Sequence, residues 1–70
     1  MNWKIGDVVA WSDETLDQMP FWIRWWFRRW RGTVVGIEDS DSVAGRLIVI
    51  GDKGNEIVMP FGRFKLVEGA

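Results

Sequence analysis

The chain contains neither cysteine nor histidine among its 70 residues. Without cysteine it can form neither a disulfide nor a thiolate metal site, and without histidine it lacks the commonest general base and metal ligand. Its carboxylates could still bind a hard cation, but no loop has the spacing of a calcium site. We therefore expect no metal and no cofactor. Because small domains usually gain stability from disulfides, metals or partner subunits, association with another chain is the remaining source.

Long apolar runs and catalytic motifs are also missing. No stretch reaches the roughly 18 apolar residues of a transmembrane helix, and residues 1–7 lack the apolar centre of a signal peptide, so we expect a cytoplasmic protein. No histidine is present to activate a serine nucleophile. The acidic residues fall in predicted loops without an evident acid/base pair, and residues 51–54 are typical of a hairpin rather than a phosphate-binding loop. The sequence predicts a non-catalytic protein.

The net charge of −1 argues against a general DNA-coating role, which requires a strongly basic domain. The charges are nevertheless unevenly distributed. Acidic residues concentrate at 12–18 and at 38–41, whereas residues 20–32 carry four arginines and no acidic residue. The small net charge therefore conceals a local dipole.

Five short segments rich in β-branched and apolar residues predict a β protein. They lie at residues 3–11, 32–37, 46–50, 56–59 and 64–67. Polar loops are expected at 12–20 and 38–45, a hairpin at 51–55, and a tight turn, often 3₁₀, at 60–63. The length allows one domain, covering residues 1–70, and short strands separated by turns indicate a small barrel.

Residues 21–31 are the exceptional segment, because aromatic residues and arginines are interleaved there. In a helix, Pro20 would take the first helical position, Asp17 or Gln18 would lie near the cap, and Gly32 would end it. In a strand, alternation would separate Phe21, Ile23, Trp25 and Phe27 from the remaining side chains. We favour a short helix leading into a strand.

Three motifs resemble the type II dihydrofolate reductases. They are Gly6-Asp7-Val8-Val9, then Trp30-Arg31-Gly32-Thr33-Val34-Val35-Gly36, and residues 60–67. The resemblance implies an SH3-like barrel, a tetramer around a central pore and an origin on a mobile cassette. That family carries Val-Gln-Ile-Tyr, which binds folate and nicotinamide, where this chain has Glu56-Ile57-Val58-Met59. The family's lysines after the first strand are replaced by Ala10 and Trp11. The resemblance therefore implies the fold and oligomerisation, but not reductase activity.

We thus expect a mainly β, five-stranded SH3-like barrel with a Trp/Arg-rich insertion, at about residues 12–31, between the first two strands. The insertion has more aromatic surface than a barrel of this size can bury. Tryptophan and arginine dominate binding hot spots, and large exposed apolar patches mark interaction sites. We predict a protein-interaction or self-association module, acting as a homodimer or homotetramer or on another protein. The predicted binding residues are Trp22, Trp25, Trp26, Phe27 and Trp30, rimmed by Arg24, Arg28 and Arg29.

Four other hypotheses rank below this one. The aromatic segment could be a flap that caps one open end of its own barrel with the arginines solvated outside, it could bind single-stranded nucleic acid, or it could lie in a membrane interface. A reductase-like enzyme is the fourth. The segment Leu47-Ile48-Val49-Ile50 is apolar on both faces, so its outer face is expected to lie under the aromatic segment or in a subunit interface.

Overall fold

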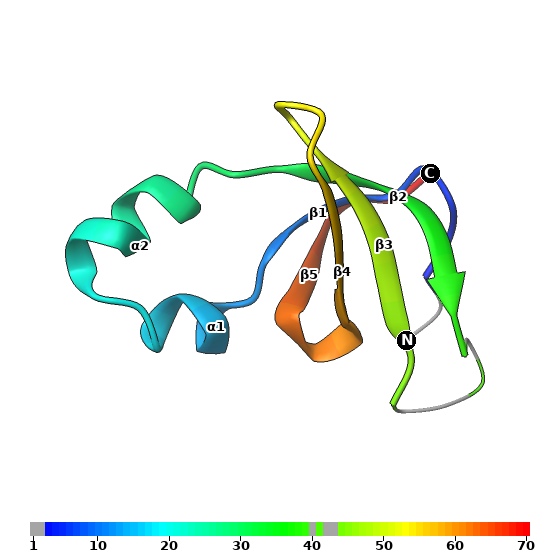
Figure 1. Cartoon of the computed structure of the whole chain (residues 1–70), viewed down its shortest axis with the longest axis horizontal. Coiled ribbons are helices and arrows are strands. Elements are labelled where there is room, and N and C mark those ends of the chain that lie inside the picture. Colours follow the sequence, from blue (N-terminus) through cyan, green and yellow to red (C-terminus); the bar gives the residue numbers. More distant parts are fainter. Residues whose placement is uncertain (1–2, 40, 42–43) are drawn as a thin grey trace.

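A computed structural model describes residues 3–39, 41 and 44–70 of the chain. Five antiparallel strands form one sheet in the order β4-β3-β2-β1-β5, and two short helices lie between β1 and β2 (Figure 1). The elements are β1 (Val8–Trp11), α1 (Asp13–Asp17), α2 (Phe21–Phe27), β2 (Gly32–Glu38), β3 (Arg46–Gly51), β4 (Glu56–Pro60), η1 (Phe61–Arg63) and β5 (Phe64–Glu68). Part of the predicted 38–45 loop, residues 40, 42 and 43, lies outside the described residues.

The mainly β class is confirmed, whereas a closed barrel is not. The sheet is open, since β4 and β5 occupy its two ends and no strand pairing joins them within the described residues. The last three predicted strands match β3, β4 and β5 closely, and η1 is the predicted 3₁₀ turn. SH3-like closure therefore stays a prediction.

Two boundaries near the N-terminus were predicted wrongly. The first strand begins only at Val8, because Gly6, with φ of 94°, lies in a turn in which Asp7 N donates to Lys4 O. The predicted loop at 12–20 contains α1. Its N-cap is Ser12, whose Oγ accepts a hydrogen bond from Thr15 N at 3.3 Å.

The core lies on one face of the sheet, where alternate side chains of each strand point inward. On β3, Leu47 and Val49 are fully buried, while Ile48 and Ile50 are half-buried on the other face. The buried cluster is completed by Val9, Trp11, Leu16, Val34 and Phe64. Helix α1 thus contributes one side chain to the core, Leu16, whereas α2 contributes no buried residue.

Trp11 is the centre of an aromatic cluster that fastens the insertion to the sheet. Its ring stacks on Phe64 from β5, with centroids 5.1 Å apart, and on Trp30 at 4.8 Å. Phe27, the last residue of α2, meets Trp11 edge to face at 6.2 Å. Such pairs contribute about 0.5–1.5 kcal/mol beyond burial alone. Phe27 and Trp30 therefore attach the C-terminal part of the insertion to the sheet, as Leu16 does for its N-terminal part.

Asp7 ties the two ends of the described chain to the sheet. Its buried carboxylate accepts hydrogen bonds from Ala70 N at 2.8 Å and from Lys4 N at 2.9 Å. These two backbone donors hold the pKa of Asp7 below its ordinary value of 3.8. The Gly6-Asp7 motif therefore has a structural role at the start of β1.

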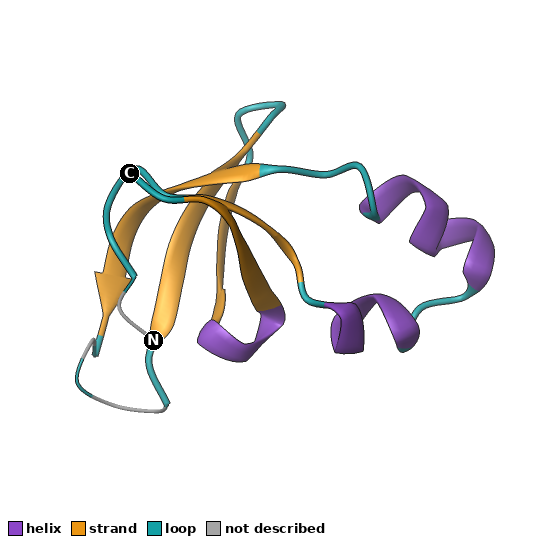
Figure 2. Ribbon diagram, turned by 180° about the vertical axis from the view of Figure 1, so that it is seen from behind, coloured by secondary structure: helices purple, strands orange, loops and turns teal. Residues whose placement is uncertain are grey.

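Figure 2 shows both helices projecting beyond one side of the sheet, at the opposite end of the molecule from the C-terminus. Because α2 lies beside the sheet in both views, it does not cover the outer face of β3. The predicted cover of the outer face of β3 by this segment is therefore not the arrangement seen here, whereas Phe27 and Trp30 of the segment do pack against the core cluster.

Candidate interaction surface

The segment after Pro20 is helical, as favoured from the sequence, but its ends differ from the prediction. Pro20 is the N-cap, with ψ of 146°, rather than the first helical residue. The helix ends at Phe27 rather than at Gly32. Residues 28–31 cross back to the sheet, and Gly32 is the first residue of β2. With seven residues, α2 is too short to be stable in water alone, so its contacts with the rest of the chain must hold it.

One side of α2 presents four aromatic side chains to solvent. A helix advances about 100° per residue, so these four residues occupy a continuous arc. Their exposed fractions are 79% for Phe21, 62% for Trp22, 55% for Trp25 and 71% for Trp26. We call these four residues the aromatic surface. Since each ring offers about 150–250 Å², the surface exposes roughly 400–650 Å².

The other predicted aromatic residues, Phe27 and Trp30, face inward. Both are partly buried and pack against the core cluster. The ring of Trp30 lies over two paired glycines: an added Cβ at Gly32 would come within 2.6 Å of its Cη2, and one at Gly51 within 2.8 Å of its Nε1. Trp30 thus occupies space that only glycine leaves free.

Of the three arginines predicted to rim the binding residues, Arg24 contacts α1 instead. Its Nε donates to Leu16 O at 2.9 Å, and its Nη2 donates to Met19 O at 3.0 Å and Asp17 O at 3.4 Å. These carbonyls lie at the C-terminal end of α1 and just after it. Arg24 therefore joins the two helices, and its guanidinium is directed to the backbone rather than to a partner.

Arg29 remains beside the aromatic surface. Its guanidinium carbon lies 4.4 Å from the ring centroid of Trp25, a cation–π contact. Trp25 and Trp26 meet edge to face with centroids 5.9 Å apart. The pair and the arginine together resemble the composition of a binding hot spot.

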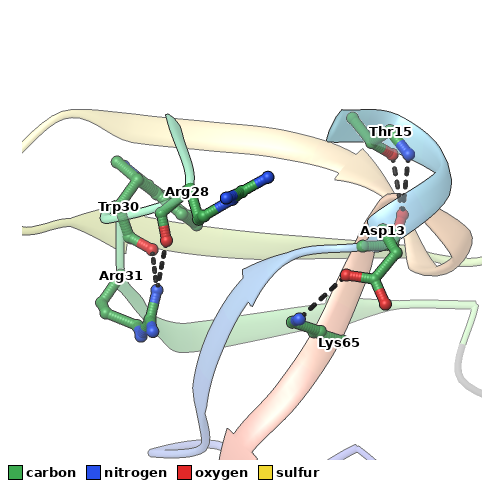
Figure 3. Close-up of polar contacts among 7 residues, drawn as sticks. Asp13, Thr15, Arg28, Trp30, Arg31 and Lys65 are labelled. Carbon is green, nitrogen blue, oxygen red and sulfur yellow. Dashed lines mark hydrogen bonds and ion pairs between the residues drawn. The ribbon is translucent and has the colours of Figure 1, made fainter. Parts of the chain in front are cut away.

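Arg28 and Arg31 lie on the crossing segment, beside a groove of about 280 Å³ that α1 also borders. Arg31 Nη1 donates to the carbonyls of Arg28, at 3.1 Å, and Trp30, at 2.8 Å (Figure 3). Asp13 and Asp17 line the same groove. Acidic and basic stretches that are separate in the sequence therefore face each other in the fold, which reduces the predicted dipole.

Lys65 of β5 forms an ion pair with Asp13 in this groove. Its Nζ lies 3.1 Å from Asp13 Oδ1 (Figure 3). Both side chains are at least half exposed, so the pair contributes well under about 1 kcal/mol. The groove is a charged feature of the protein surface, lined by both acidic and basic side chains.

Two groups of residues, one in the aromatic surface and one in a cavity beside it, were not predicted from the sequence. Phe21 is the most exposed large side chain of α2 but was not among the predicted binding residues, although the helical arc includes it. Asp52, Lys53 and Asn55, from the β3–β4 hairpin, line a cavity together with Trp26. Nothing local in the sequence connects that hairpin with α2.

The described part of the chain contains neither a metal-binding cluster nor a membrane-spanning helix. Within it, no three acidic residues come together as a group that could hold a metal ion. No helix among the described residues combines the length and the apolar character needed to span a bilayer.

Comparisons with known proteins give no family for this chain. No protein-family model, no curated protein and no solved structure matches it. The resemblance to the type II dihydrofolate reductases accordingly stays a prediction from the sequence motifs.

Proposed function

We propose that the protein is a non-catalytic self-association module in which two copies join through their aromatic surfaces. The observation that carries this proposal is α2 itself: a helix of seven residues, six of them apolar, with no buried residue. Exposing such a helix to water is unfavourable, because its apolar area gains about 25 cal/mol per Å² on burial.

The size of the aromatic surface supports a second copy as the partner. Its roughly 400–650 Å² reaches or exceeds the largest apolar patch of a typical monomer, about 300–600 Å². A standard interface buries about 800 Å² on each partner. A two-fold axis places the same patch on both sides, so the aromatic surface with Arg29 at its rim supplies most of the area required.

The small size of the domain favours the same conclusion. A 70-residue chain without cysteine has no disulfide to supplement its core. The SH3-like barrel of the prediction is part of this proposal, and it is supported by five short antiparallel strands with a 3₁₀ turn before the last one. Burial of α2 between two such barrels would leave both sheets unchanged.

The proposal is tested by measuring molar mass against concentration, with light scattering after size exclusion and with sedimentation equilibrium. Wild type should show a reversible dimer. The Trp22→Ser/Trp25→Ser variant should weaken it by at least about 30-fold, since hot-spot truncation costs about 2 kcal/mol or more. Circular dichroism verifies that the variant folds.

Val58→Ser is the matched control, because Val58 is an exposed apolar residue (42% exposed) that belongs to β4 and not to the aromatic surface. It should leave the dimer unchanged. A wild-type protein that stays monomeric into the millimolar range contradicts the proposal. So does loss of the dimer in Val58→Ser with retention in the double tryptophan variant.

A further inference from the structure

A cavity of about 330 Å³ separates the end of α2 from the β3–β4 hairpin. Trp26 and Trp30 line it on the helical side, and Gly51 and Ile57 line it on the sheet side. Ligand cavities have volumes of about 300–1,000 Å³, so this one suits a small molecule. Its apolar lining includes the indole groups of Trp26 and Trp30.

The polar groups of the cavity are mostly donors and cations. Arg29 and Lys53 contribute positive charges, Asp52 contributes one negative charge, and Asn55 contributes an amide. In the described part of the chain, the ion pairs are Arg46–Glu38 and Lys65–Asp13, and none involves these three charged groups. The cavity therefore carries a net charge of +1 that no neighbouring side chain neutralises.

Trp30 adds a further donor. Its Nε1 lies beside Gly51, 2.8 Å from the point where a Cβ at residue 51 would be placed. An indole N–H can only donate, so a ligand that satisfies it must bring an acceptor. Arg29, Lys53 and this N–H all favour an anionic group that accepts hydrogen bonds.

We propose that this cavity binds a small planar aromatic anion with a single negative charge, such as an aromatic carboxylate. The ring stacks on the indoles, a contact of about 1–3 kcal/mol for each ring. The carboxylate lies between Lys53 and Arg29, where a charge-assisted hydrogen bond is stronger than a neutral one. Asp52 disfavours a second negative charge on the ligand.

The cavity does not depend on self-association. Trp26 belongs both to the cavity and to the aromatic surface, whereas Phe21 belongs to the surface alone. Binding is therefore measured on wild type and on the Phe21→Ser variant. Binding by both forms supports the cavity whether or not wild type dimerises, so the two proposals can fail separately.

The probe is 2-naphthoate, and its neutral analogue 2-naphthamide is the charge control. Binding is followed by the indole N–H signals in ¹H–¹⁵N spectra. We expect saturable shifts of Trp26 and Trp30 and smaller shifts of Trp22. Naphthamide should bind several-fold more weakly, because the carboxylate contacts are absent.

Charge variants at the hairpin give the sharpest test. Lys53→Gln should weaken naphthoate binding about three- to fivefold, and Asp52→Asn should strengthen it by a similar factor, as expected for one charge at a few ångströms in a wet site. Lys4→Gln is the matched control and should change nothing, since Lys4 lies in the turn before β1.

An increase in affinity in Asp52→Asn cannot arise from damage to the fold. Equal affinity for naphthoate and naphthamide, equal shifts of all exposed tryptophans, or absence of saturation would each overturn the proposal.

Discussion

Removing the guanidinium of Arg24 should loosen the whole insertion. The Arg24→Met variant keeps a long apolar side chain of similar shape but no donor. Three hydrogen bonds to the backbone of α1 and its C-terminal turn are then lost, at 2.9, 3.0 and 3.4 Å. The carbonyls concerned belong to the end of α1 and the turn after it, and among them Leu16 O also accepts a hydrogen bond from Met19 N at 3.1 Å.

The magnitude follows from the exposure of each bond. The bonds to Leu16 O and Met19 O are partly buried, and the bond to Asp17 O is exposed. Hydrogen bonds to charged groups contribute about 1.5–3 kcal/mol each when buried. Counting the exposed bond as zero and half of each remaining bond as replaced by water, the loss in unfolding free energy is roughly 1.5–3 kcal/mol. This lowers the melting temperature by about 6–24 °C in a domain of this size.

Urea denaturation followed by circular dichroism measures this loss. Arg28→Met is the matched control, since Arg28 is an exposed arginine of the same segment, and it should stay within about 0.5 kcal/mol of wild type. Arg24→Lys should fall between the two, because an ammonium cannot reproduce the planar fork of guanidinium. Equal losses in Arg24→Met and Arg28→Met would refute the role of Arg24.

Two further changes test the packing and the N-terminal turn. Gly32→Ala should cost about 1–3 kcal/mol in unfolding free energy, since its Cβ would meet Val49 and come within 2.6 Å of Trp30. Gly62→Ala, with nothing within 4 Å, should cost nothing, and similar losses would contradict the packing. Because the pKa of Asp7 lies below its ordinary 3.8, its contribution is present above that value and is lost as the pH falls through its folded pKa. Stability measured in urea from neutral to acid pH should therefore decline less in Asp7→Asn than in wild type, and parallel declines would exclude the carboxylate as the cause.

Strands could be predicted in this chain because their signal is local. In β3, the sequence is apolar throughout, and β-branched residues with flanking glycine were enough to locate it. Barrel closure depends on how far β2 and its neighbours curve, which no single segment encodes. Helix α1 had a local signal, Ser12 followed by the acidic Asp13 and Glu14, which is typical of a helix start. The acidic composition of residues 12–20 was interpreted as a loop instead.

The exposure of individual tryptophans could not be predicted in the same way. Trp25 and Trp30 are the same residue type, five positions apart, and each is flanked by aromatic or basic neighbours. Their fates diverge because α2 ends between them and because Gly32 and Gly51, paired across β2 and β3, leave room for one ring. That pairing joins residues 19 positions apart in the sequence. The inward position of Trp30 is therefore a property of the sheet rather than of the segment.

The arrangement of anchors explains how so short a helix can present an aromatic surface. A seven-residue helix cannot persist by its own hydrogen bonds, and α2 buries no residue. Arg24 holds its middle to α1, while Phe27 fixes its last residue against Trp11 of β1. These anchors fix the backbone positions of the four exposed aromatic residues, so the association that we propose would not have to order the helix first. This pre-organisation favours the proposed binding of a defined partner, a second copy of the chain, over nonspecific adhesion.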